Sequence, residues 1–206
     1  MIEPMFRTER LMARHFEPRD LDDFAALCAD PVVMRFVGDG STLGRDDVAY
    51  WIEVCQRKYA DRGYGTSAVF ELSSGEFVGY CGVVRAPERD YDELVYVFHQ
   101  RFWGLGYATE IGRAMLDYVF AISPLDAIAA TIDPDNAASR RVAAKLGMTE
   151  QPHAGAGPGE DERPHAGKLG MTKQPHADKL GMTKQPRAGA GPGEDEPAVR
   201  YVLTRV

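Results

Sequence analysis

Hydrophobic residues recur with two different periods along the chain, and the changes between them divide it into strands and helices. Runs that alternate or are continuously apolar predict strands, whereas apolar residues three or four positions apart predict helices with one buried face. Strands are therefore expected at 8–15, 66–72, 76–84, 93–99, 126–132 and 198–206, and helices at 18–29, 43–62, 107–122 and 137–146.

Turn and cap residues support these boundaries. Ser41 or Thr42 is suited to cap the second helix, and Asn136 is suited to cap the last one, because their side chains accept from free helical amides. Gly63 and Gly147 follow the ends of the same two helices, where glycine is common. The order predicts an antiparallel meander followed by strand, helix, strand and helix, and such a helical crossover allows two neighbouring strands to be parallel.

The junction between the strand at 93–99 and the following helix carries the sequence Gly104-Leu105-Gly106. Glycine permits a positive φ and has no Cβ to keep a ligand from the backbone amides. These amides also lie at a helix N-terminus, which favours anions. We therefore predict a phosphate-binding turn. The same residues fit a dinucleotide-binding pattern loosely, but that pattern wants the glycine turn after the first strand and an acidic ribose partner about 20 residues later.

Several motifs in the correct order are similar to one family. Arg101-Phe102-Trp103-Gly104-Leu105-Gly106 fits the Q/R-x-x-G-x-G/A signature of the GNAT superfamily of acetyltransferases. The following Y-A-T-E, the opening T-E-R-L-M-A-R and the later N-A-A-S-R-R-V-A-A-K-L-G-M resemble its RimJ/RimL-like branch, which acetylates ribosomal proteins. The resemblance extends over residues 8–148. It implies an α/β (α+β) GNAT fold, in which helices flank a mixed, mostly antiparallel sheet.

The resemblance also implies which residues contact the substrates. The loop between the first two helices is expected on the acceptor side, although ordinary core packing is the favoured interpretation of Trp51, an aromatic residue at helical spacing. The residues expected to contact the acceptor are Arg35, Phe36 and Trp51. Those expected to bind acetyl-CoA are Val97, Phe98, Arg101, Phe102, Trp103, Gly104, Leu105, Gly106, Tyr107, Ala108, Thr109, Asn136 and Ser139.

Two residues are candidates for proton transfer. Glu93 occupies the glutamate position of the family's E-x-G-Y pattern, which reads E-L-V-Y here, and is the expected base; Asp92 on the other face of the strand is the alternative. Glu93 also fits a solvated charge at a strand end. Ser139 lies one helical turn beyond Asn136 and is the expected proton donor to the departing thiolate, although Asn136 and Ser139 also fit simple roles at a helix start.

The pattern breaks down after Gly147. K-L-G-M-T recurs at Lys145, Lys168 and Lys179, and A-G-A-G-P-G-E-D-E occurs twice. These copies are too short and too rich in glycine and proline to bury an apolar face. Residues 1–150 and 198–206 are therefore expected to form one domain, with 151–197 as a flexible insertion. Any of the three K-L-G-M-T copies could supply the penultimate strand. The histidines of three P-H-A copies follow the duplication, so no metal is expected.

Composition limits the partners. The formal net charge of −7 disfavours nucleic acid and mildly favours a cationic amine. Without a long apolar run or signal core, we expect a cytoplasmic protein with no membrane contact. The three cysteines form no C-x-x-C pair and are expected as buried thiols. A homodimer is compatible with the sequence but not indicated by it.

The expected function is acetyl-CoA-dependent N-acetyl transfer to a primary amine, at a protein N-terminus or on a small molecule. The alternatives are a non-catalytic CoA-binding or sensing module and a nicotinamide site.

Overall fold

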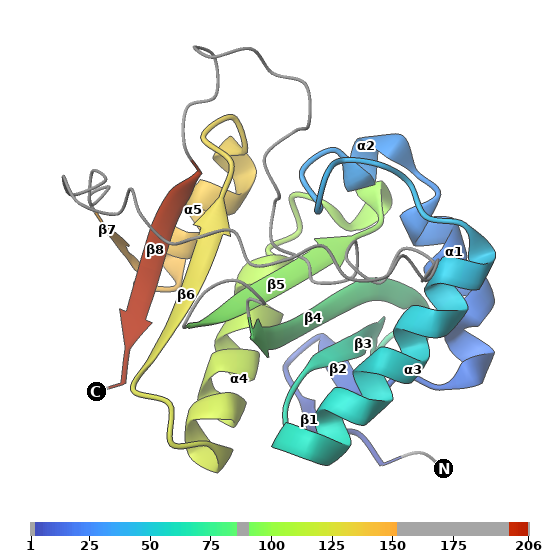
Figure 1. Ribbon diagram of the computed structural model, residues 1–206, viewed down its shortest axis with the longest axis horizontal. Helices are drawn as coiled ribbons and strands as arrows, with labels where there is room; N and C mark the ends of the chain where they lie inside the picture. Colours follow the sequence, from blue (N-terminus) through green and yellow to red (C-terminus); the bar gives the residue numbers. More distant parts are fainter. Residues whose placement is uncertain (1–2, 86–90, 152–197, 206) are drawn as a thin grey trace, which may run out of the picture.

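A mixed eight-stranded sheet forms the centre of the protein (Figure 1). The computed structural model describes residues 3–85, 91–151 and 198–205. The sheet has the order β1-β2-β3-β4-β5-β6-β8-β7. Its strands are β1 Phe6–Arg7, β2 Leu11–Arg14, β3 Thr66–Glu71, β4 Phe77–Arg85, β5 Asp92–Phe98, β6 Ala127–Ile132, β7 Thr149–Gln151 and β8 Val199–Thr204. The helices are α1 Leu21–Cys28, α2 Pro31–Met34, α3 Arg45–Arg62, α4 Tyr107–Ile122 and α5 Ala137–Lys145, with short 3-10 turns at Pro18–Asp20 and Gln100–Phe102.

One parallel pair interrupts an otherwise antiparallel sheet. The strands β5 and β6 are parallel and are joined through α4, as the predicted crossover requires. Their Cα register pairs Glu93 with Ala129, near the start of β5, and from there the two strands run apart (Figure 1). The sheet therefore opens toward the C-terminal ends of β5 and β6, where ligands commonly bind in open α/β sheets.

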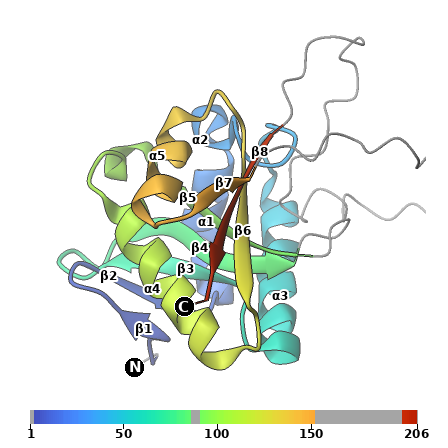
Figure 2. The same cartoon turned by 90° about the vertical axis from the view of Figure 1, so that its left-hand side faces the viewer.

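Helices cover both faces of the sheet, and each face has its own apolar core. Figure 2 shows α4 and α5 on one side of the sheet and α3 on the other. Ile111 and Met115 of α4 and Leu146 after α5 pack in the first core, whereas Phe24 of α1 and Trp51 of α3 pack in the second. All five side chains are almost fully buried, which is the main favourable contribution to folding.

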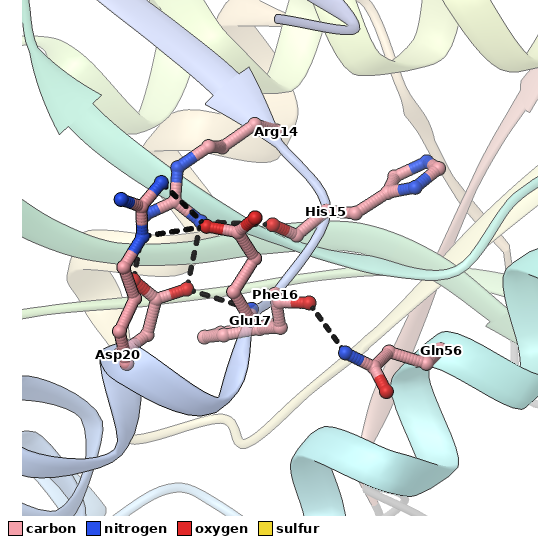
Figure 3. Close-up of polar contacts among 7 residues, drawn as sticks. Arg14, His15, Phe16, Glu17, Asp20 and Gln56 are labelled. Carbon is pink, nitrogen blue, oxygen red and sulfur yellow. Dashed lines mark hydrogen bonds and ion pairs between the residues drawn. The ribbon is translucent and has the colours of Figure 1, made fainter. Parts of the chain in front are cut away.

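A buried ion pair fixes the entry into α1. The guanidinium of Arg14, at the end of β2, donates to both carboxylate oxygens of Asp20 at 2.7 and 2.6 Å (Figure 3). Asp20 also accepts from the backbone amide of Glu17, and the Gln56 side chain on α3 donates to the Phe16 carbonyl at 3.0 Å. Because each buried polar group has a partner, this chain reversal carries no large desolvation penalty.

Most predicted elements are confirmed, with differences at their ends. The second long helix begins at Arg45 with Gly44 as its N-cap, so the prediction of a Ser41 or Thr42 cap is wrong. The backbone amide of Ser41 donates instead to the Asp39 side chain, which builds a turn before the helix. The strand β1, of two residues, and the helix α2, of four residues, were not predicted, because such short segments show no periodicity.

The chain end closes the sheet as expected. The strand β7 begins at Thr149, the last residue of the first K-L-G-M-T copy, and β8 lies between β6 and β7. The two later copies, the P-H-A histidines and nearly all of the expected insertion lie outside the described residues.

The three cysteines are free and buried, and burial raises the pKa of Cys28 and of Cys55 to about 12. Within the described residues, no helix is long and apolar enough to cross a bilayer.

Candidate active site

A cavity of about 510 Å³ occupies the opening between the separated strands. Its walls come from β5 and β6, from the turn before α4, from the first turns of α4 and α5, and from the segment around α2. Most of its lining is apolar, with polar groups at few positions, which is typical of ligand-binding sites. The lining residues used below are Arg35, Phe36, Tyr96, Val97, Phe98, Phe102, Trp103, Gly104, Gly106, Tyr107, Ala108, Thr109, Thr131, Asn136 and Ser139.

The glycine turn lines one end of this cavity. Gly104 and Gly106 have φ angles of 76° and 83°, in the left-handed region that favours glycine. Gly106 is the N-cap of α4. Within the described part of the chain, the amides from Gly104 to Ala108 have no backbone acceptor outside their own helix. Helix-terminal amides without a backbone acceptor form a good anion-binding site, so these residues fit a diphosphate.

The structure brings together most of the residues expected to bind the cofactor. Eleven of the thirteen line the cavity; Arg101 and Leu105 do not. The Arg101 guanidinium lies over the Phe102 ring and 3.7 Å from the carboxylate of Glu76 at the surface. Trp103 is held by a hydrogen bond of 2.7 Å from its indole N–H to the Phe98 carbonyl. The Arg101 charge therefore lies outside the cavity, whereas the backbone of the turn lines it.

The first turn of α5 faces the cavity opposite β5. The Asn136 side chain accepts from the Ser139 backbone amide at 3.1 Å, so Asn136 caps the helix as predicted and also lines the cavity. Ser139 and Tyr96 of β5 both line the cavity. Burial raises the pKa of Tyr96 to about 12, against a smaller opposing effect of the nearby Ser139 side chain.

Tyr96 is a candidate that the sequence reasoning missed. The sequence motifs assigned proton donation to Ser139 alone. The available signal was strand alternation, because Leu94, Tyr96 and Phe98 share one face of β5, and that face packs toward α4. Tyr96 is thus the last residue of the E-L-V-Y segment, but the sequence pattern assigned it no role.

The two acidic residues at the start of β5 have different surroundings. Glu93 is only 2% exposed and accepts a hydrogen bond from the Thr131 hydroxyl on β6. The interpretation of Glu93 as a solvated strand-end charge is therefore wrong. Asp92 is equally buried but is bound by the Tyr64 hydroxyl at 3.1 Å and by the Arg85 guanidinium at 2.9 Å. Both Asp92 oxygens are therefore already engaged by other side chains.

The residues expected on the acceptor side separate into two groups. Arg35 and Phe36 line the cavity, with the Arg35 guanidinium 4.9 Å from the centre of the Phe36 ring. Trp51 does not line this cavity; it packs in the second core against Phe24 and Tyr80, with ring centroids 4.8 and 5.3 Å apart. Core packing therefore explains Trp51.

Comparison with known proteins agrees with this geometry. Residues 10–149 match the family model described as an acetyltransferase (GNAT) domain. The chain belongs to the GNAT acetyltransferase family. This result confirms the resemblance found in the sequence, the predicted fold class and the prediction of an N-acetyltransferase.

Individual GNAT relatives extend the comparison. The uncharacterised protein YkkB of Bacillus subtilis is 38% identical over 146 residues, which are 68% of this chain and 83% of that protein. An FsC-acetyl coenzyme A-N(2)-transacetylase of Aspergillus fumigatus is 30% identical over 158 residues, 71% of this chain and 66% of the relative. The solved structure of RimL, a ribosomal L7/L12 α-N-protein acetyltransferase in complex with coenzyme A, has a TM-score of 0.68 at 14% identity and covers 98% of both chains. At that identity, the likeness shows the fold alone.

Metal chemistry finds no support in the described residues. Nowhere in 3–85, 91–151 and 198–205 do three or more histidine, cysteine or acidic side chains gather closely enough to hold an ion. The cavity of this GNAT protein combines backbone amides of the glycine turn with side-chain hydroxyl groups, one of which, on Thr131, donates to the buried Glu93 carboxylate.

Proposed function

We propose that this protein is an acetyl-CoA-dependent N-acetyltransferase whose acceptor is a primary amine. The single observation that carries the proposal is the cavity between β5 and β6, with Tyr96 and Ser139 in its wall and, at one end, amides of the glycine turn that have no backbone acceptor among the described residues. Two relatives support it, since one is an FsC-acetyl coenzyme A-N(2)-transacetylase and the other, RimL, was solved in complex with coenzyme A. Residues 1–150 and 198–206 would form the catalytic domain.

The backbone of the turn is suited to hold the cofactor diphosphate. Gly104, Gly106, Tyr107 and Ala108 line the cavity and have amides available to an anion, and the α4 dipole favours negative charge there. When bound, acetyl-CoA supplies a thioester whose carbonyl carbon the amine attacks. Val97 and Phe98 continue the cavity wall along β5, where a pantetheine arm would lie.

Glu93 is suited to receive the proton that the amine must lose. Only the neutral amine is a nucleophile, and a carboxylate within reach of it, directly or through a water molecule, can accept the proton. Because Glu93 does not line the cavity itself, whereas its partner Thr131 does, a proton would reach it through the Thr131 hydroxyl or a water molecule.

The Tyr96–Ser139 pair is suited to supply a proton to the departing sulfur. Ser139 would donate its proton and recover one from Tyr96, which stays protonated at neutral pH because burial raises its pKa to about 12. Glu93 and Tyr96 are three residues apart on one strand, so their side chains point to opposite faces of the sheet. Proton removal and proton donation would thus occur on opposite sides of the opening, with the acceptor entering on the side of Arg35 and Phe36.

A thiol-release assay tests this function directly. The protein is incubated with acetyl-CoA and a panel of N-terminal peptides, polyamines and small primary amines, and free CoA thiol is measured. We expect turnover with at least one amine and binding of CoA in calorimetry. Tight CoA binding without turnover on any acceptor would instead indicate the non-catalytic CoA-binding module. Thermal stabilisation by NAD but not by CoA would contradict the proposal altogether.

A further inference from the structure

Arg10, on the outside of the glycine turn, joins three parts of the protein. Its guanidinium donates to the Glu110 carboxylate on α4 at 2.7 Å and to the Leu105 carbonyl at 3.0 Å. Its backbone amide donates to the other Glu110 oxygen at 2.9 Å, and the Thr8 hydroxyl donates to that oxygen at 2.6 Å. The segment before β2 is thereby tied to both the turn and the first turns of α4.

The contact to Leu105 constrains the direction of the next amide. In a trans peptide the C=O of Leu105 and the N–H of Gly106 point in opposite directions. Arg10 holds this carbonyl on its own side of the turn, and Arg10 and Leu105 do not line the cavity whereas Gly106 does. The Gly106 N–H is therefore turned toward the cavity.

The same guanidinium also fixes the first residue of α4. It lies 4.7 Å from the centre of the Tyr107 ring, a cation–π distance. The Tyr107 hydroxyl donates to Glu71 at the end of β3, so this side chain is held at both its face and its tip. The main-chain carbonyl of Arg10 accepts from the Leu72 amide at 2.8 Å, which anchors Arg10 to the sheet independently of its side chain.

We infer that Arg10 is a positioning residue for coenzyme binding: together with Glu110 it orients the amides of the Gly104–Ala108 turn toward the diphosphate. This inference rests on the proposed function. It gives a physical role to the opening T-E-R-L segment, which is about 95 residues from the turn in sequence. A rigid supporting contact of this kind lowers the cost of ordering the turn when an anion binds.

Calorimetric titration with CoA tests the inference in the full-length protein, with no need for a known acceptor. Arg10→Ala removes all side-chain contacts, whereas Arg10→Lys keeps the charge but cannot make the forked and stacked contacts together. Arg19→Ala is the matched control, because Arg19 donates to the Glu17 carboxylate at 2.7 Å in an exposed pair that does not involve the turn. Melting temperatures without ligand show whether each variant is folded.

We expect Arg10→Ala to raise the CoA dissociation constant about tenfold or more, Arg10→Lys to lie between, and Arg19→Ala to stay within about twofold of the wild type. Once an acceptor is known, kcat/KM with S-acetylpantetheine, which lacks the diphosphate, should be unchanged in Arg10→Ala. An unchanged CoA dissociation constant in Arg10→Ala, or an equal loss with S-acetylpantetheine, would overturn the inference. Absence of CoA binding by the wild type would overturn the proposed function, and this inference with it.

Discussion

The side chains of Tyr96 on β5 and Ser139 in the first turn of α5 lie close enough to interact across the gap between these two elements. Both residues line the cavity, and the Ser139 amide is itself fixed by the Asn136 side chain. A serine hydroxyl alone is a weak proton donor. In the proposed function a buried phenol beside it would supply a second proton, so that the two residues would act together as a short relay.

Removal of the phenol hydroxyl tests whether this pair takes part in catalysis. We expect Tyr96→Phe and Ser139→Ala each to lower kcat by about tenfold to a hundredfold, since general acid catalysis commonly contributes 10²–10⁴-fold and part of it would remain. The double variant should lose little more than either single variant, because the two groups act as one unit. Single-turnover rates at saturating acetyl-CoA provide the measurement.

Tyr118→Phe is the matched control for this pair. Tyr118 lies on α4, packs against Phe6 with ring centroids 5.5 Å apart, and does not line the cavity. Its loss of a hydroxyl should leave kcat unchanged. Additive losses in the Tyr96 and Ser139 double variant would show that the two hydroxyls act separately.

Glu93→Gln tests the proposed base. The amide can still accept from the Thr131 hydroxyl, so the local structure should persist, but it cannot take a proton from the amine. We expect kcat/KM to fall by about a hundredfold or more while the CoA dissociation constant stays within about twofold. Glu53→Gln on the exposed face of α3 is the control. A Glu93→Gln rate equal to that of the control would remove Glu93 from the mechanism.

The sequence predicted the glycine turn well because its signal is local. Positive φ, the helix start and the motif spacing all depend on neighbours within a few residues of Gly104 and Gly106. Asn136 was identified as a cap for the same reason, and the structure confirms it. The crossover between β5 and β6 followed from the order of the elements alone.

The contacts that could not be predicted are those between distant segments. Arg10 and Leu105 meet only through the packing of the first strands against α4, and no local pattern reports such a distance. Tyr96 and Ser139 meet because β5 and α5 lie on either side of the opening. For Trp51 the family resemblance suggested a contact with the acceptor. The structure instead buries this large aromatic side chain between α1 and the sheet, where it packs in the second core.

Acid pH should destabilise the protein through His99. Its pKa is lowered, mainly by burial and secondly by the nearby charge of Arg101. Below the ordinary pKa of 6.5, His99 binds a proton in the unfolded chain but not in the folded chain. The contribution of neutral His99 to the free energy of unfolding is therefore present above pH 6.5 and is lost as pH falls through the folded pKa. We expect denaturation midpoints of His99→Gln to fall less steeply than those of the wild type between about pH 7 and 5. Parallel curves for the two proteins would contradict this.

Gly104→Ala separates strain in the turn from loss of coenzyme binding. A Cβ at Gly104 would meet no protein atom within 4 Å, so its cost within the protein comes from the positive φ, about 1–2 kcal/mol. Gly75, in the turn between β3 and β4, offers a matched site, because its φ is 74° and a Cβ there would also meet nothing within 4 Å. Both alanine variants should therefore lower the free energy of unfolding by similar amounts in denaturant titrations.

Only the Gly104→Ala variant should weaken coenzyme binding. Gly104 lines the cavity and its turn presents the amides, so a Cβ there intrudes on the space that a diphosphate would need, whereas Gly75 is not part of the lining. We expect Gly104→Ala to raise the CoA dissociation constant by about tenfold or more and Gly75→Ala to leave it unchanged, both measured by calorimetry. Equal CoA affinity in the two variants would place the diphosphate away from Gly104, because the strain introduced is the same in both and only proximity to the ligand differs.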